Sequence, residues 1–183
     1  MKTPRPSIRD VGNGLEFGMM VFSDMKNEIQ IKFLADCPEF IPQISKWFFE
    51  EWGYIDPENS IEATSERLRL KLNKDKIPLL IVACKDQEIL GVLELKNREM
   101  EEFPDYEHWL GGVYVAPRAR GVGLASTMLN WAEQLANSLG VRQLYLQTEK
   151  HDGGLYARAG WLPLHSILSK GVEVLVMMKE LDR

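Results

Sequence analysis

The sequence has few residues of the kinds that build metal centres and disulfide scaffolds. Its 183 residues include only two cysteines, Cys37 and Cys84, and three histidines. The cysteines lie far apart without metal-ligand spacing and the histidines are scattered, so no metal site is expected. We expect both cysteines to be free thiols in a reducing cytoplasm, not partners in a disulfide.

Long apolar runs and an excess of positive charge are also missing. No run approaches the roughly 18 apolar residues of a membrane helix, and residues 1–11 lack the apolar core of a signal peptide. The net charge of −5 does not favour nucleic acid as an obligatory partner. The composition is that of an ordinary globular protein, with 45% hydrophobic residues. We expect a loosely packed extension over residues 1–27 and a single domain over residues 28–183.

The most informative stretch covers residues 109–139. Its run Val113-Tyr114-Val115 predicts a buried strand, which Pro117 ends because proline cannot donate to a strand ladder. A helical pattern follows and Gly140 marks its end. The pattern places these apolar residues on one face: Val122, Ala125, Leu129, Ala132, Leu135, Ala136 and Leu139. The glycines at 121 and 123 therefore lie where a strand leads into the first turn of a helix.

A glycine loop at this position suits an anion. The first turn of a helix has unpaired N–H groups and the positive end of the helix dipole. Gly121 and Gly123 have no Cβ to keep an anion from the backbone, and Arg118 and Arg120 would add charge and donors. The sequence predicts a phosphate or pyrophosphate site. The alternative is a tight turn with solvated arginines.

Two familiar phosphate loops fit this stretch poorly. Residues 121–126 nearly match the dinucleotide pattern G-x-G-x-x-G, with Glu149 at the end of the next expected strand, but Ser126 replaces the third glycine. Pro117 and two arginines also lengthen the connection, and too little chain follows for a doubly wound sheet. A Walker-type loop is excluded because no Gly-Lys-Ser/Thr is present.

Two motifs together resemble the GNAT superfamily of N-acetyltransferases. Arg120-x-x-Gly123-x-Ala125 is similar to its Q/R-x-x-G-x-G/A signature, and the segment from Leu155 and Tyr156 to Gly160-Trp161 is similar to its second signature. The resemblance covers roughly residues 29–181 and is strongest over 109–161. It implies an α/β (mixed α+β) fold with a central mixed sheet of about six to seven strands and helices on both faces. It also implies acetyl-CoA as cosubstrate and no metal.

The resemblance also implies site residues. The pantetheine arm would lie along Val113, Tyr114 and Val115, whose backbone N–H groups would face the acetyl carbonyl oxygen. Tyr156 would be the general acid for the departing thiolate, and Gly111-Gly112 would permit a strand bulge. The pyrophosphate would bind at Arg120, Gly121, Val122, Gly123, Leu124, Ala125 and Ser126.

The general base is less well specified. Many relatives carry a glutamate on the strand before the phosphate loop, where this chain has two glycines. Glu94 on the preceding strand is a candidate, as are Glu107 or His108 at the entrance and a water relay; an unperturbed histidine has a suitable pKa. His151 lies where relatives often place a polar side chain on the pantetheine, and its role stays open.

The remaining elements follow from hydrophobic periodicity. We expect strands at 28–33, 79–84, 89–95, 141–148, 161–165 and 172–177, the second and third forming a hairpin. We expect helices from Cys37 to Trp52, over 153–160, and after a Ser60 cap carrying Ile61, Leu68, Leu70 and Leu72. Pro78 would close the Ser60-capped segment. The order is β-α-α-β-β-β-α-β-α-β-β.

Some side chains near the expected acceptor site allow two interpretations. Trp47, Trp52 and Tyr54 would line one wall of that site or pack in the core. Glu94 would face solvent or the catalytic cleft. The acidic run 99–108 is expected to be a solvated loop; if it borders the cleft, it would favour a cationic amine.

We therefore expect a cytoplasmic N-acetyltransferase that moves acetyl from acetyl-CoA to a primary amine. Direct attack is expected because no Cys or Ser stands in a nucleophile motif. The acceptor would be a small-molecule amine or a protein amino group, and the protein a monomer or homodimer. Two alternatives are a CoA-binding regulatory module with little catalysis and, less favoured, an NAD(P)-dependent enzyme.

Overall fold

The computed structural model describes residues 20–21, 29–56 and 58–181, in which eight strands form one sheet. The expected N-terminal extension therefore lies outside the described residues except at 20–21. The order across the sheet is β1-β2-β3-β4-β5-β6-β8-β7, and only β5 and β6 are parallel neighbours. The strands are β1 (Met20–Val21), β2 (Gln30–Phe33), β3 (Leu79–Lys85), β4 (Glu88–Asn97), β5 (His108–Val115), β6 (Gln143–Thr148), β7 (Leu162–Ser169) and β8 (Val172–Glu180). From β2 onward the seven strands and four α-helices follow the expected order, and the expected fold class is confirmed.

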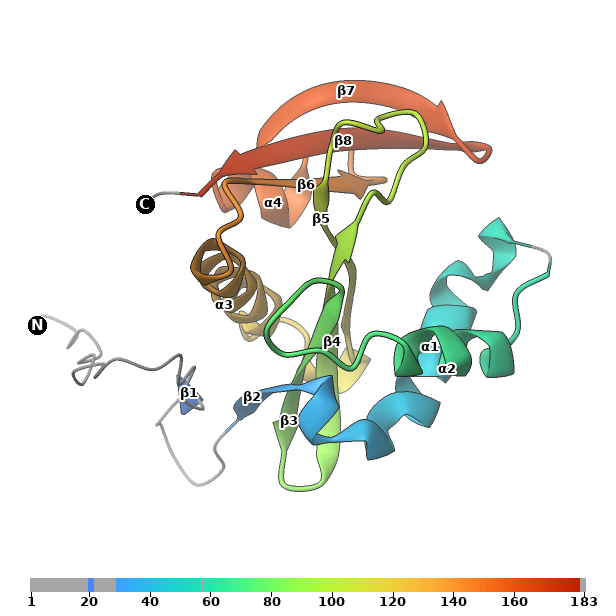
Figure 1. The fold of residues 1–183 in the computed structure, drawn as a ribbon, viewed down its shortest axis with the longest axis vertical. Helices are drawn as coiled ribbons and strands as arrows, with labels where there is room; N and C mark the ends of the chain where they lie inside the picture. The colour runs from blue at the N-terminus through green and yellow to red at the C-terminus, as the bar shows by residue number, and fades with distance from the viewer. Residues whose placement is uncertain (1–19, 22–28, 57, 182–183) are drawn as a thin grey trace, which may run out of the picture.

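Helices cover both faces of the sheet. They are α1 (Ile41–Trp52), α2 (Ile61–Arg69), α3 (Leu124–Ser138) and α4 (Gly154–Arg158). Figure 1 shows α1 and α2 on one side of the central strands and α3 on the other. Side chains of β4 alternate accordingly: Val92 packs in the cluster beneath α1 and α2, whereas Leu93 and Leu95 pack in the cluster beneath α3.

Three helix boundaries differ from expectation. α1 begins at Ile41, after a separate single turn over Pro38–Phe40. Ser60 caps α2 as expected, its Oγ accepting the Ala63 N–H at 3.0 Å, but α2 ends at Arg69 and leaves Leu70 80% exposed beyond it. α3 begins at Leu124, so Val122 is 72% exposed and not part of the apolar face.

The acidic run before β5 is only partly the solvated loop that we expected. Its aromatic residues cover the outer end of the sheet: Tyr106 stacks on Tyr145 of β6 with ring centroids 4.0 Å apart, and Phe103 stacks on Tyr106. Ser169 of β7 donates a 2.8 Å hydrogen bond to Glu102. In Figure 1 this loop runs beside β8 and β7. The rings of Tyr106 and Phe103 hold this loop against the sheet. The expectation of a solvated loop rested on its carboxylates and overlooked these two aromatic residues.

None of the helices in the described ranges is both long and apolar enough to cross a membrane.

Candidate active site

The expected phosphate loop joins β5 to α3. After β5 the chain makes one turn over Pro117–Ala119 and then passes through Gly121 and Gly123, with φ of +79° and +83°. Such left-handed backbone is strained for other residues. Gly123 is the N-cap of α3 and provides no side-chain cap. A Cβ at either glycine would meet no atom within 4 Å, so the N-terminus of α3 opens onto free space.

The residues of the loop differ in what they present. The side chain of Leu124 is buried, so only its backbone is available to a ligand. Ala125 is partly buried, whereas Val122 and Ser126 are exposed. With the glycines, these residues place N–H groups of the first helical turn towards solvent. The arrangement is chemically suited to an anion.

Both arginines of the loop are held by protein contacts. Arg118 bonds Glu88 at 2.6 Å and the carbonyl oxygen of Ile89 at 3.1 Å. Arg120 donates from Nε to the Val115 carbonyl at 2.8 Å, and its guanidinium lies 5.6 Å from the ring centroid of Tyr114. Arg118 therefore ties the loop to the β3–β4 turn, and Arg120 braces the end of β5.

β5 separates from β6 just before this loop. The two strands pair only at Trp109 and Tyr145 in the described structure. On its other edge, β5 continues to pair with β4 but is bulged, since Gly112 and Val113 lie opposite the single residue Leu93. Gly112 has a φ of +55° at the bulge. The expected bulge is present, and the β6 side of Val113–Val115 is left without a strand partner.

Tyr156 lies on α4, the short helix after β6. It is half-buried, and its ring packs edge-on against Trp161 with centroids 6.2 Å apart. Burial raises the pKa of the Tyr156 phenol to about 12, and the negative charge of Glu99 adds to the shift. The hydroxyl therefore stays protonated at neutral pH and can donate a proton or a hydrogen bond.

Two of the candidate bases, Glu94 and His108, occupy different positions. Glu94 is the register partner of Gly111, is 4% exposed, and forms a close ion pair with Lys71. It is thus excluded from solvent. His108 begins β5, three residues or about 10 Å along the strand from Gly111, and its Nδ1 lies 3.2 Å from Asn97 Oδ1. The structure brings Glu94 to the bulge and leaves His108 at the far end of the strand.

Sequence reasoning missed a second ion pair beside the bulge. Lys96 Nζ lies 2.8 Å from Glu99 Oε1, and Gln147 of β6 donates to the same oxygen at 3.0 Å. Burial by itself would lower the pKa of Lys96, but the carboxylates of Glu99 and Glu94 raise it above its usual value. Glu99 stood in an acidic run with no periodicity, so nothing in the sequence separated it from its exposed neighbours.

Of the three aromatic residues expected to line the acceptor site, Trp47 and Trp52 pack against other aromatic rings, whereas Tyr54 contacts the end of β6. Trp47 is 8% exposed and stacks on Tyr114 at 4.8 Å, and Trp52 packs edge-on against Phe48. Tyr54 is 64% exposed and donates a 3.2 Å hydrogen bond to Glu149 at the end of β6. Desolvation raises the pKa of Tyr54, with further contributions from the charges of Glu149 and Glu51.

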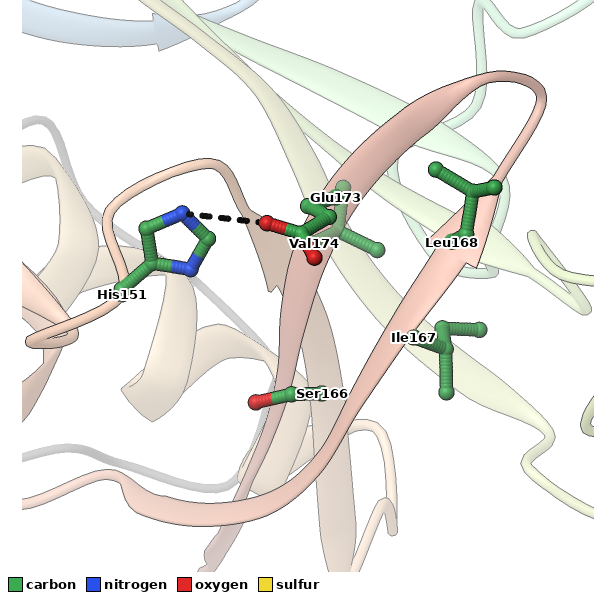
Figure 2. A pocket seen from close by; sticks show the side chains of 6 residues that line it. All are labelled: His151, Ser166, Ile167, Leu168, Glu173 and Val174. Carbon is green, nitrogen blue, oxygen red and sulfur yellow. Dashed lines mark ion pairs between the residues drawn. The ribbon is translucent and has the colours of Figure 1, made fainter.

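His151 faces the β7–β8 hairpin. Figure 2 shows it beside a hollow in this hairpin, its Nε2 3.9 Å from Glu173 Oε2. The hollow is lined by His151, Ser166, Ile167, Leu168, Glu173 and Val174. Its wall contains neither Tyr156 nor any residue of the glycine loop.

Comparisons with known proteins agree with this fold. The acetyltransferase (GNAT) family model matches residues 41–161, although no curated protein matches the sequence significantly. An acetyltransferase of the GNAT family from Streptococcus pneumoniae is 16% identical, with a TM-score of 0.62 over 85% of this chain and 100% of that chain.

Two further solved structures carry a coenzyme. An aminoglycoside 6'-N-acetyltransferase complexed with coenzyme A is 15% identical, with a TM-score of 0.66 over 84% of this chain and 97% of that chain. A putative acetyltransferase from Salmonella typhimurium with acetyl-CoA is 18% identical, with a TM-score of 0.61 over 85% of this chain and 95% of that chain. These likenesses show the shared fold. Because the family model spans well over half of the sequence, the chain belongs to the GNAT family of acetyltransferases and is an acyltransferase.

Proposed function

We propose that the protein moves the acetyl group of acetyl-CoA to a primary amine by direct attack of the amine nitrogen. The observation that carries this proposal is the continuity between two features. The left-handed glycine loop opens the N-terminus of α3, and the unpaired edge of β5 begins immediately before it. One feature suits a pyrophosphate and the other an extended arm with amide groups.

The loop and the strand would divide the binding of acetyl-CoA between them. The N–H groups from Gly121 to Ser126 would receive the pyrophosphate, with Arg120 alongside. The pantetheine arm would take the place of the missing strand partner along Val113, Tyr114 and Val115. The space in front of Gly121 and Gly123 fits the pyrophosphate, because no protein atom lies within 4 Å of the position that a Cβ would take at either glycine.

The chemistry needs hydrogen-bond donors for the oxyanion, an acid for the departing thiolate and a base for the amine proton. As the amine nitrogen forms its bond to the acetyl carbon, negative charge develops on the carbonyl oxygen, which the N–H groups of residues 113–115 would stabilise. The carbon–sulfur bond then breaks, and Tyr156 would give its proton to the sulfur. The amide and free CoA are the products. A cationic acceptor loses two protons: one passes to solvent before the attack, and the other replaces the proton that Tyr156 gave to the sulfur.

Of Glu94 and His108, Glu94 is the better placed. It lies opposite Gly111, whereas His108 lies at the start of β5. Glu94 is buried and paired with Lys71, however, so the amine would not meet its carboxylate directly. Glu94 would therefore act through a water that carries the proton out, and His108 would take no part.

The acceptor would be a small amine or a protein amino group, bound by a single domain over residues 28–183 in a monomer or homodimer. One solved relative is an aminoglycoside 6'-N-acetyltransferase and another a putative phosphinothricin N-acetyltransferase. A cationic acceptor would be favoured here, because Glu51 and Glu149 flank Tyr54 at the outer end of α1.

Calorimetric titration with acetyl-CoA, run in parallel with NADPH, tests the proposal. We expect micromolar acetyl-CoA binding, no heat with NADPH, and a thermal shift that follows the affinity. Acetyl transfer is then followed with spermidine, tobramycin, phosphinothricin and a lysine peptide. A Tyr156→Phe variant should keep acetyl-CoA affinity and lose turnover. CoA binding without transfer to any acceptor would favour the regulatory module, and absence of CoA binding would refute the proposal.

A further inference from the structure

The two oxygens of the Glu99 carboxylate have different surroundings. Oε1 accepts hydrogen bonds from Lys96 and Gln147, whereas Oε2 is buried and has no hydrogen-bond partner. It is the single side-chain oxygen or nitrogen in the described part of the chain with that property. A buried acceptor without a donor is unfavourable, so a native structure that retains one calls for an explanation.

This oxygen lies beside the bulge of β5. A Cβ built on Gly111 would lie 3.1 Å from Glu99 Oε2 and 2.8 Å from Lys96 Nζ. The space above Gly111 is therefore filled by the ends of two flexible side chains, not by backbone. Glu99 is contacted by Lys96 of β4 and by Gln147 of β6, so it bridges the strands on either side of β5 where β5 and β6 separate.

Glu99 and Tyr156 approach this place from opposite faces of the sheet. Lys96 alternates with Leu95 along β4, and so shares the α1/α2 face with Val92. Tyr156 packs against the core cluster on the α3 face. An acyl donor threaded between the two strands would thus have Tyr156 on one side and Glu99 on the other. In that arrangement the side away from Tyr156, where Glu99 lies, would be left for the second substrate.

We propose that Glu99 is a specificity-determining residue of the acceptor site, whose Oε2 receives an N–H of a cationic amine. This inference rests on the proposed acetyl transfer and names the group that binds the acceptor. Lys96 and Gln147 hold Oε1 and leave the other oxygen for the substrate. Glu94 and Glu99 are each paired with a lysine, so the cationic amine would add its charge to a site whose own charges nearly cancel.

A purely structural role for Glu99 predicts a different behaviour. If Glu99 were only a strut between β4 and β6, Glu99→Gln would lower stability by removing the counter-charge of Lys96 but would leave the amine affinity unchanged, because the amide oxygen still accepts from Lys96 and Gln147. As a binding group for a cation, the carboxylate loses its charge in that variant. Glu99→Gln therefore separates the two roles. Glu101→Gln is the matched control, since Glu101 lies on the same loop and is exposed.

The experiment measures acceptor binding without turnover. Spermidine and tobramycin are titrated calorimetrically into wild type, Glu99→Gln and Glu101→Gln, each saturated with CoA. We expect at least one amine to bind wild type and Glu101→Gln equally, and to bind Glu99→Gln roughly 10- to 100-fold more weakly, the loss of a charge-assisted hydrogen bond. The affinity for CoA should be the same in all three proteins.

Each other outcome overturns the inference. Equal amine binding by Glu99→Gln and Glu101→Gln would leave Glu99 without a role in the acceptor site. A parallel loss of CoA affinity would make it part of the scaffold. Failure of both amines to bind wild type would refute a cationic acceptor. Absence of CoA binding by wild type is a separate result, which counts against the proposed function itself.

Discussion

The indole N–H of Trp161 donates a 2.8 Å hydrogen bond to the carboxylate of Glu133, linking the end of the Tyr156 segment to α3. The second oxygen of Glu133 lies 2.6 Å from Lys179 Nζ on β8. Glu133 is 9% exposed. The backbone N–H of Trp161 also donates a 3.1 Å hydrogen bond to the carbonyl oxygen of Tyr156. Glu133 therefore anchors the segment that carries the proposed general acid.

Replacing Glu133 by alanine should lower the free energy of unfolding by about 3 kcal/mol, because it leaves the buried indole N–H without an acceptor and Lys179 without its counter-charge. Urea denaturation measures the change. The exposed neighbour Gln134 on the same helix provides the control, and its alanine variant should differ from wild type by less than about 0.5 kcal/mol. Equal stability of the two variants would contradict the anchoring role.

The glycine loop allows backbone strain and ligand binding to be separated. Gly123 and Gly140 have φ of +83° and +86°, at the beginning and end of α3, and a Cβ at either would meet no atom within 4 Å. Alanine at each should therefore destabilise the protein similarly, by about 1 kcal/mol. Only Gly123→Ala should weaken acetyl-CoA binding, roughly 10-fold, as measured by calorimetry. Equal affinities would remove Gly123 from the phosphate site.

Local patterns were sufficient to predict most of the fold. Two apolar runs separated by a polar turn predicted β3 and β4 and their hairpin, and the Ser60 cap was confirmed by the hydrogen bond that its Oγ accepts from Ala63. Val122 was misplaced because its spacing fits the helical face, whereas the positive φ of Gly121 and Gly123 keeps the helix from starting before Leu124. Spacing reports side-chain periodicity and is blind to the backbone conformation of glycine.

The candidate site was predictable only where it is local in sequence. The loop from Arg120 to Ser126 is contiguous in the sequence, so its motif could be identified without a structure. The pairing of Lys96 and Glu99 with Gln147 depends on the separation of β5 from β6, which brings residues 48 positions apart into contact. A single sequence contains no signal for such a contact. Glu99 could be distinguished from Glu101 only when the sheet was assembled.

Tyr156 should ionise late as the pH rises. Its pKa of about 12 in the folded protein exceeds the ordinary value of 10.0. The folded state therefore holds the phenolic proton more tightly, and the stability that this proton contributes is complete below pH 10 and is lost as the pH rises through about 12. Between pH 10 and about 12, the unfolding free energy should fall more steeply in wild type than in Tyr156→Phe. Parallel slopes would contradict the raised pKa.

Both cysteines should be unreactive in the native protein. Cys37 and Cys84 are free and buried, and burial is the first cause that raises both pKa values, that of Cys37 to about 12. Because the thiolate is the reactive species, a thiol reagent at pH 8 should react slowly with native protein and rapidly with both thiols in denaturant. Rapid reaction of either thiol in native protein would contradict this burial.

Gly111 should matter to the acceptor more than to the fold. A Cβ at this position would lie 2.7 Å from Lys96 Cε and 3.1 Å from Glu99 Oε2, the ends of flexible side chains that can move. Gly111→Ala should therefore change the unfolding free energy by less than about 1 kcal/mol while displacing the Lys96–Glu99 pair. We expect amine binding to the CoA-saturated protein to weaken roughly 10-fold, by calorimetry.

Gly91 provides the opposite case for comparison. A Cβ there would lie 2.9 Å from the buried Met128 Sδ and 3.1 Å from the backbone carbonyl oxygen of Tyr114, which cannot move without disturbing β5. Gly91→Ala should therefore lower the unfolding free energy by about 1–3 kcal/mol, the usual cost of overpacking a core. If Gly111→Ala instead lost stability as Gly91→Ala does and kept its amine affinity, the space above Gly111 would serve packing alone and the acceptor would bind elsewhere.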